Sequence, residues 1–517
     1  MIHTGRNTAL AGRQEDAEEL RTLVDLALGA LRDASTKRTG PVAAGGPGAA
    51  ASALGRVLDG GGFLTERPEP ERLTELFEAY AAGAVDLTHP AAVSRMQCAP
   101  TAAAVAAELL AAALNQSLHA WESGPFALEL ERRLIAEMAS WAGFGARASG
   151  TLTPGGSISN LMGLLAAREH ALRRHGDVTR SGLTGLPVVP RILCSAAAHF
   201  SIARAAGFLG LGRDAVVTVP VDERGRMRVA EARRILDGLT SDEVPLAIVA
   251  TAGTTDHGSF DPLPELADLA AERGIWLHVD AAYGIGALFS PSLAPLLDGL
   301  DRADSLAFDL HKFGWSPASS SVLLVRDAQH LRCLDQQAVY LNPSDDEAAG
   351  LTSLLSTSMQ TTRRSDAFKM AASLLTLGRE GMGAWVDRCH ALARHAAARI
   401  AARPDLELLA EPVLSTVIFR CSPPAEGVPD PNAWNAAVRR TLLTRGRALL
   451  ARTKVTGTDG EPRVHLKLVF LNPGTTEADV DELLADVAAV ARELAAADRE
   501  PGTDHDRPPA DDRLMAS

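Results

Sequence analysis

The chain has few aromatic residues, few cysteines and few lysines for its length. Only 4% of its 517 residues are aromatic. Its five cysteines lie far apart and form no CxxC pair: Cys98, Cys194, Cys333, Cys389 and Cys421. Scattered thiols in odd number indicate a reduced protein of the cytoplasm and argue against a structural metal site. The formal net charge of −13, without any long basic run, excludes the basic stripe of a nucleic-acid-binding surface.

Long apolar runs are also missing. The first 16 residues have no apolar core of the length that a signal peptide needs. The alanine-rich stretch 103–116 is too short to cross a membrane and ends in polar residues. We therefore expect a cytoplasmic protein without membrane contact.

What the chain does have is the composition of a globular protein, 46% hydrophobic and 22% charged, with room for two or three domains. From about residue 150, strand-like and helix-like segments alternate, which predicts βαβ units and a mainly parallel sheet covered by helices. The expected organisation is an N-terminal helical segment over 1–100 with a flexible stretch at 35–52, a large domain over 101–375, a small α+β domain over 376–497, and a disordered tail over 498–517.

Two charged residues follow strand-like runs. Lys312 in "DLHK" sits among small and apolar neighbours. Such a lysine either extends its ammonium to solvent or is a desolvated amine that can form a Schiff base. Asp280 ends the apolar run "WLHVD", where a carboxylate needs a cation or hydrogen bonds. It is either a turn residue or the partner of a pyridine nitrogen, whose protonated form is an electron sink.

Three further stretches carry candidate ligand-binding residues. "TPGGSISN" begins an apolar helix and contains Gly155 and Gly156. The start of a helix suits a phosphate, but residues of this kind also begin ordinary helices. It matches neither GxxxxGK[ST] nor GxGxxG. His199 follows a strand and could stack on a flat ring. Thr254 follows another strand, at the end where open α/β sheets bind ligands.

Five motifs, in this order and spacing, resemble those of the group II pyridoxal-phosphate-dependent decarboxylases: "TPGGSISN", "HFSIARAAGFLG", "TAGTTDHGSFDPL", "WLHVDAAYG" and "DLHK". This family includes glutamate, cysteine-sulfinate, aromatic and diaminobutyrate decarboxylases, and the resemblance extends over about residues 75–495. It implies the α/β type I aminotransferase-like fold and the cofactor pyridoxal 5′-phosphate. It also implies a homodimer with the active site at the interface and an N-terminal segment wrapped across the partner.

The resemblance also implies the roles of individual residues. Lys312 would attach the cofactor covalently, Asp280 would pair with its pyridine nitrogen, and His199 would stack on its ring. The remaining cofactor contacts would be Ala282 beneath the ring, Thr254 near it, and Ile158, Ser159 and His311 at the phosphate. Arg363 and Arg364 match a family motif as well, and we expect them to form structural ion pairs.

The chain departs from the family at the substrate end. Many relatives carry a tyrosine on a mobile loop that protonates the substrate carbon, but residues 342–360 contain none, which leaves Tyr340, His199 or water as the donor. Lys467 stands where relatives commonly have an arginine near the substrate carboxylate, and it would either bind that group or face solvent. Arg95 would line the mouth of the substrate site or be an ordinary exposed arginine.

The expected reaction is α-decarboxylation of an L-amino acid to CO₂ and an amine. "GGSISN" and "TAGTTDHGSFDPL" favour an acidic substrate like aspartate or glutamate, including a methyl-branched or carrier-protein-tethered form, whereas "DLHKFGW" favours diaminobutyrate or another basic amino acid. Aldehyde-forming oxidative deamination, β-elimination and a non-catalytic cofactor-binding role are the alternatives. The alanine- and arginine-rich composition suggests bacterial specialised metabolism, such as antibiotic biosynthesis.

Overall fold

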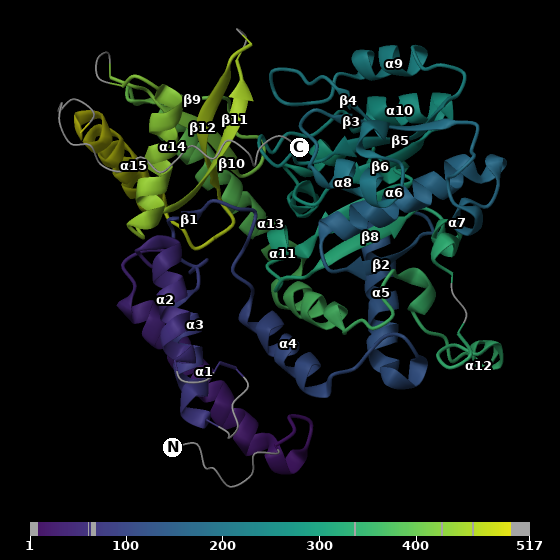
Figure 1. Cartoon of the computed structure of the whole chain (residues 1–517), viewed down its shortest axis with the longest axis horizontal. Coiled ribbons are helices and arrows are strands. Elements are labelled where there is room, and N and C mark those ends of the chain that lie inside the picture. The colour runs from purple at the N-terminus through teal and green to yellow at the C-terminus, as the bar shows by residue number, and fades with distance from the viewer. Residues whose placement is uncertain are drawn as a thin grey trace.

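The structure is a computed structural model that describes residues 9–59, 62–63, 69–335, 338–424, 428–457 and 460–497. The tail predicted over 498–517 lies outside these residues. A large and a small β-sheet organise the chain, with the N-terminal helices below the small sheet in Figure 1.

The large sheet has seven strands in the order β2-β8-β7-β6-β5-β3-β4. Strands β3 to β7 pair in parallel, and β2 and β8 pair antiparallel at one side. The predicted mainly parallel sheet is therefore confirmed. Its strands are β2 (Ser149–Thr153), β3 (Val189–Ser195), β4 (Val216–Val219), β5 (Glu243–Thr251), β6 (Trp276–Asp280), β7 (Ser305–Asp309) and β8 (Ser321–Val325).

Helices cover both faces of this sheet, because alternate strand residues point to opposite sides. On β5, Ala247 and Val249 belong to an apolar cluster with helices α6 and α8, whereas Ile248 and Ala250 belong to a second cluster with α10. The helices around the large sheet are α5 (Pro125–Trp141), α6 (Gly156–Leu172), α7 (Val178–Ser181), α8 (Ser201–Phe208), α9 (Val229–Asp237), α10 (Leu263–Arg273), α11 (Leu310–Phe313) and α12 (Ser344–Ala348).

The small sheet has five strands in the order β1-β11-β12-β10-β9 and is covered by α14 and α15. Its elements are β1 (Ala92–Val93), β9 (Leu406–Leu408), β10 (Thr416–Cys421), α14 (Pro431–Thr444), β11 (Leu449–Thr456), β12 (Pro462–Val469) and α15 (Glu477–Ala497). Helix α13 (Asp366–Ala401) connects the two sheets and is interrupted at Gly378, whose φ of 60° suits glycine. The division into domains, with a boundary near residue 375, stays a prediction.

The N-terminal region forms α1 (Ala17–Lys37), α2 (Gly46–Leu58), α3 (Pro70–Gly83) and α4 (Ala102–Leu114). The expected loop over 35–52 is too long, because residues 46–52 already belong to α2. Pro47 stands in the first turn of this helix, where a missing N–H costs nothing, and the alanines that follow are strong helix formers. The glycines of this stretch were the reason for predicting a loop.

None of the described helices is both long and apolar enough to cross a bilayer. Across the same residues, no group of three or more histidine, cysteine, aspartate or glutamate side chains is placed to hold a metal ion.

Candidate active site

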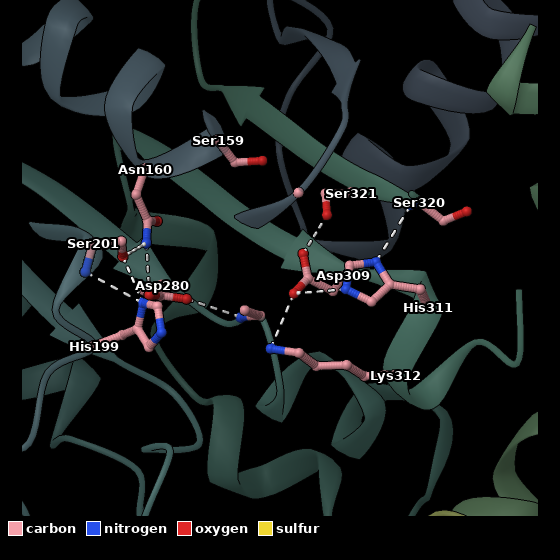
Figure 2. Close-up of polar contacts among 12 residues, drawn as sticks. Ser159, Asn160, His199, Ser201, Asp280, Asp309, His311, Lys312, Ser320 and Ser321 are labelled. Atoms are coloured by element: carbon pink, nitrogen blue, oxygen red, sulfur yellow. Dashed lines mark hydrogen bonds and ion pairs between the residues drawn. The ribbon is translucent and has the colours of Figure 1, made fainter. Parts of the chain in front are cut away.

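The candidate site lies at the carboxyl ends of the parallel strands β6 and β7. Asp280 is the last residue of β6 and pairs in register with Ala307 of β7. Strand β7 ends at Asp309 and passes directly into the short helix α11, which carries Lys312. Figure 2 shows Asp280 and Lys312 reaching into the same region from these two neighbouring elements. This is the edge at which open α/β sheets bind ligands.

Lys312 has a carboxylate partner. Its Nζ atom lies 3.0 Å from Oδ2 of Asp309, and the Asp309 side chain is only 3% exposed. Ser321 donates its hydroxyl proton to the other carboxylate oxygen, Oδ1. The ion pair compensates the cost of placing the ammonium among apolar neighbours. Sequence reasoning missed Asp309, although it stands three residues before Lys312, at the end of a buried strand.

Asp280 is buried and held by two donors. Its Oδ2 atom accepts a hydrogen bond from the side-chain amide of Asn160 at 2.8 Å, and Oδ1 accepts from the backbone N–H of Ala282 at 3.1 Å. Such bonds fix the orientation of a carboxylate. The sequence placed Asn160 in the phosphate-binding stretch, but the structure directs its side chain to Asp280.

His199 lies beside both charged residues. Its Nδ1 atom accepts hydrogen bonds from the hydroxyl of Ser201 at 2.8 Å and from the Ser201 backbone N–H at 3.3 Å. Burial lowers the pKa of His199, and the positive charge of Lys312 lowers it further, while Asp280 raises it. The imidazole is therefore neutral near pH 7, with its proton on Nε2. The structure thus brings the three predicted catalytic side chains together.

The start of helix α6 forms a cradle next to these residues. A Cβ atom on Gly156 would lie 3.0 Å from Asp309 Oδ1 and 3.5 Å from the Cβ of Ala282, so glycine keeps this space open. Within the described part of the chain, the backbone N–H groups of Gly156 and Ser157 have no hydrogen-bond partner. Free N–H groups at the positive end of a 17-residue helix suit a phosphate.

Two predicted phosphate contacts are already engaged elsewhere. The N–H of Ile158 donates to Gly155 O at 2.8 Å, and the hydroxyl of Ser159 bonds to that of Thr153 at 2.7 Å. His311 accepts from Ser320 N through Nδ1 and has its Nε2 3.5 Å from Asp309 Oδ2. Burial lowers the pKa of His311, so its ring is neutral as well.

An attachable amine, a fixed carboxylate and free N–H donors are together the set that pyridoxal phosphate needs.

Thr254 lies in the loop that follows β5 and is fully buried. Its hydroxyl oxygen accepts a hydrogen bond from the backbone N–H of Ser259 at 3.1 Å, and the backbone N–H of Gly258 donates to its carbonyl. These bonds shape the loop. A contact of Thr254 with the cofactor ring stays a prediction.

Lys467 faces inward. The side chain is buried on β12, and its Nζ donates to Thr255 O at 2.9 Å and to Asp256 Oδ1 at 2.8 Å. The alternative that Lys467 faces solvent is therefore wrong. Sequence reasoning missed Asp256. Burial raises the pKa of its carboxyl, but the charge and hydrogen bond of Lys467, together with a hydrogen bond from Thr453, outweigh burial and lower the pKa overall.

The other two substrate candidates, Arg95 and Tyr340, lie on the surface. Arg95 is exposed, and the Tyr340 side chain is 83% exposed. The structure gives neither residue a hydrogen bond or ion pair with the site side chains described above.

The two arginines of the "TTRR" motif form the ion pairs expected of them. Arg363 Nη2 lies 2.8 Å from Glu131 Oε1, with both side chains buried, and Arg364 Nη2 lies 3.0 Å from Glu108 Oε1 nearer the surface. This prediction is confirmed.

Comparison with known proteins identifies the family. The family model of the pyridoxal-dependent decarboxylase conserved domain matches residues 65–422, more than half of the chain. The chain is 42% identical over 409 residues to an L-2,4-diaminobutyrate decarboxylase of Rhizobium meliloti (strain 1021), covering 78% of this chain and 79% of that one. It is 32% identical over 433 residues to the cysteine sulfinic acid decarboxylase of Rattus norvegicus, covering 82% and 86%.

A solved structure agrees with these relatives. The glutamate decarboxylase domain of a diaminobutyrate-pyruvate transaminase and L-2,4-diaminobutyrate decarboxylase from Vibrio parahaemolyticus superposes with a TM-score of 0.81 at 30% identity, covering 93% of this chain and 97% of that one. The type I fold is thereby confirmed. The chain belongs to the pyridoxal-dependent decarboxylase family and is a pyridoxal-phosphate-dependent amino-acid decarboxylase, a carboxy-lyase.

Proposed function

We propose that this decarboxylase acts on a short basic L-amino acid of the 2,4-diaminobutyrate type. The observation that carries the proposal is the 42% identity to the Rhizobium meliloti diaminobutyrate decarboxylase, against 32% for the rat cysteine sulfinic acid decarboxylase. The charges near the site support it. Lys467 is neutralised by Asp256, and Lys312 by Asp309. Because both lysines are already paired, a second carboxylate on an acidic substrate would find no free ammonium at either position.

An acidic substrate is the second candidate. The motifs "GGSISN" and "TAGTTDHGSFDPL" favour it, and acidic and cysteine sulfinic acid decarboxylases are among the relatives at 30–33% identity. Such a substrate would have to displace Asp256 from Lys467 or recruit an exposed arginine such as Arg95. The first route separates the paired charges of Lys467 and Asp256, which costs free energy.

We assign the following roles to the residues of the site. The Lys312 amine would hold the cofactor covalently. The Asp280 carboxylate, held by Asn160 and Ala282, keeps a proton on the pyridine nitrogen. The bound cofactor supplies the electron sink for the bond between Cα and the carboxylate. His199 packs against the ring in its neutral form, and the helix start at Gly156 holds the phosphate.

The proton that replaces CO₂ at Cα has two candidate side-chain sources besides water. Nε2 of His199 carries a proton and belongs to the same chain as Lys312. The phenol of Tyr340 is exposed, so it serves only if a second subunit brings its own Tyr340 to this site. When the donor is slow, oxygen competes for the reacting carbon, which is the route to oxidative deamination.

We also propose the homodimer that the family resemblance implies. Helix α4 exposes Val105, Leu109, Leu110 and Leu114, each by 42–55% of its surface. Exposed apolar side chains gathered on one helix suit an interface. The test is light scattering of purified protein: we expect a dimer for the wild type and a shift toward monomer for Leu109→Glu, while a wild-type monomer would contradict the proposal.

Product analysis tests the substrate. Purified enzyme with pyridoxal phosphate is incubated with diaminobutyrate, ornithine, lysine, aspartate, glutamate and cysteine sulfinate, and with the same amino acids tethered to a carrier protein. We expect CO₂ and 1,3-diaminopropane from free diaminobutyrate. Turnover of the acidic amino acids alone would select the second candidate. Ammonia with peroxide would identify an oxidative deaminase, and turnover only of tethered forms would identify a carrier-bound substrate. The place of the enzyme in specialised metabolism stays a prediction.

A further inference from the structure

A continuous chain of polar side chains runs from the site into the interior of the large sheet. Asn160, which Figure 2 shows bonded to both Asp280 and Ser201, is the member of this chain next to the site. The Oδ1 atom of Asn160 lies 3.0 Å from Nε2 of His278, a fully buried histidine two residues before Asp280 on β6. Nδ1 of His278 lies 2.7 Å from Oγ of Ser305, and the same Oγ accepts from the indole N–H of Trp276 at 2.8 Å.

The chemistry of the groups fixes the direction of every bond in this chain. Asp280 is a carboxylate that only accepts, so the NH₂ of Asn160 faces it and the amide oxygen of Asn160 faces Nε2 of His278, which must donate. Nδ1 of the neutral ring then accepts the hydroxyl proton of Ser305, whose oxygen accepts from the indole N–H of Trp276. Burial lowers the pKa of His278 to about 4, so the ring is neutral and its single proton sits on Nε2. That N–H donates to the amide oxygen of Asn160.

The amide group of Asn160 is thereby held in one orientation. Its NH₂ donates to Asp280 Oδ2 at 2.8 Å and to Ser201 Oγ at 2.9 Å. Ser201 in turn donates to Nδ1 of His199. A flipped amide would point its oxygen at the Asp280 carboxylate and its NH₂ at the N–H of His278, so that acceptor faced acceptor and donor faced donor.

We propose that His278 is a positioning residue. By fixing the side-chain amide of Asn160, it orients the carboxylate of Asp280 directly and the ring of His199 through Ser201. The proposal rests on the proposed function, in which Asp280 pairs with the pyridine nitrogen of the cofactor and His199 packs against the face of its ring. Gly163 of α6 belongs to the same arrangement, because a Cβ there would lie 2.6 Å from Cε1 of His278. Helix α6 can pack on the imidazole only without a side chain at this position.

The experiment is a double-mutant cycle in the enzyme loaded with pyridoxal phosphate. His278→Leu removes the donor, His278→Gln keeps an N–H near the place of Nε2, and each is combined with Asn160→Ala. The matched control is His465→Leu, because His465 is the other histidine of similar burial on a described strand, β12. The readouts are kcat, KM and the circular dichroism of the bound cofactor.

We expect His278→Leu to lower kcat by about 10- to 100-fold, as for other residues that orient a catalytic group, and to weaken the cofactor dichroism. His278→Gln should recover most of both, and His465→Leu should match the wild type. In the Asn160→Ala background, His278→Leu should change kcat by less than about twofold, because coupled residues are not additive. The proposal would be overturned if the losses in kcat of the two single variants multiplied in the double variant. It would also be overturned if His278→Gln lost as much kcat and cofactor dichroism as His278→Leu.

Two further variants cover a folding failure of His278→Leu and test the role of Asp280 separately. If His278→Leu does not fold, Ser305→Ala takes its place in the cycle, because it leaves the imidazole but removes the hydroxyl that sets its tautomer, and the same coupling to Asn160→Ala is expected. Asp280→Asn tests the proposed function separately: unchanged kcat and an unchanged cofactor spectrum would reject the role of Asp280. The coupling between His278 and Asn160 is measured independently of that result.

Discussion

Lys312 and Asp309, three residues apart, form an ion pair with 3.0 Å between Nζ and Oδ2. The carboxylate is buried, also contacts the ring of His311, and lies against the glycine cradle at the start of α6. The amine to which we assign covalent attachment of the cofactor is thus part of a charge pair in this structure.

The first prediction concerns this pair. Asp309→Asn leaves the ammonium of Lys312 without its carboxylate partner and should lower the free energy of unfolding of the cofactor-free protein by about 3 kcal/mol or more. Urea unfolding measures this loss. Ser321→Ala is the control, because it removes a hydrogen bond to Asp309 but leaves the ion pair in place, and it should cost about 0.5–1.5 kcal/mol. An unfolding free energy in Asp309→Asn equal to that of the wild type would contradict the importance of the pair.

The second prediction compares the two neighbouring arginines. Arg363 is buried with Glu131 and also donates to Leu152 O, so it ties helix α5 to strand β2. Arg363→Ala leaves a buried carboxylate uncompensated and should lower the free energy of unfolding by about 3–5 kcal/mol. Arg364 is half exposed, and Arg364→Ala should cost about 1 kcal/mol or less. Urea unfolding measures both, and equal losses would be the contrary result.

The third prediction concerns the thiols. Burial raises the pKa of Cys98, Cys194 and Cys421 to about 12 and that of Cys333 to about 11, and it raises the pKa of Cys389 as well. At pH 8 all five should be protonated and poorly reactive, since the thiolate is the nucleophile. A disulfide reagent should label none of them rapidly in the native protein and all five after denaturation. Rapid native labelling of any one would contradict this account of its surroundings.

The fourth prediction is a pH dependence of stability. His278 has a pKa of about 4 in the folded protein, below the ordinary 6.5, so between these values the unfolded chain binds a proton that the folded chain does not. Stability should therefore fall as the pH falls through this window, by about 2 kcal/mol at pH 5 relative to pH 7. The glutamine variant of His278 lacks this contribution. The unfolding free energy of the cofactor-free wild type minus that of His278→Gln should thus shrink from pH 7 to pH 5, and a constant difference would refute the prediction.

Local patterns in the sequence predicted most of what positions the site. The parallel strands were visible as short apolar runs separated by amphipathic helices, and their carboxyl ends had to meet at one edge of the sheet. Lys312, Asp280 and His199 could therefore be placed together before any coordinates. Helix α2 was not predicted, because its glycines suggested a loop while its alanines determined the structure.

The partners of these residues could not be predicted in the same way. Asp309, Asn160 and Asp256 look like ordinary strand-end, helix and turn residues in the sequence. Asp309 pairs with Lys312 three positions later, whereas Asn160 and Asp256 acquire their roles through side-chain contacts across the fold. Asn160 lies 120 positions from Asp280, and Asp256 lies 211 positions from Lys467. No local spacing signals contacts of that range. The choice of substrate depends on such contacts, and the sequence motifs favoured an acidic amino acid while leaving a basic one open.

The covalent linkage at Lys312 is the central claim, and one measurement tests it most directly. The chain has only five lysines: Lys37, Lys312, Lys369, Lys454 and Lys467. The enzyme is loaded with pyridoxal phosphate, reduced with borohydride and digested, and the modified peptide is identified by mass. We predict a single phosphopyridoxyl group on the peptide that contains Lys312, and no modified peptide in Lys312→Ala. A stoichiometric adduct on any of the other four lysines, with Lys312 unmodified, would contradict the account.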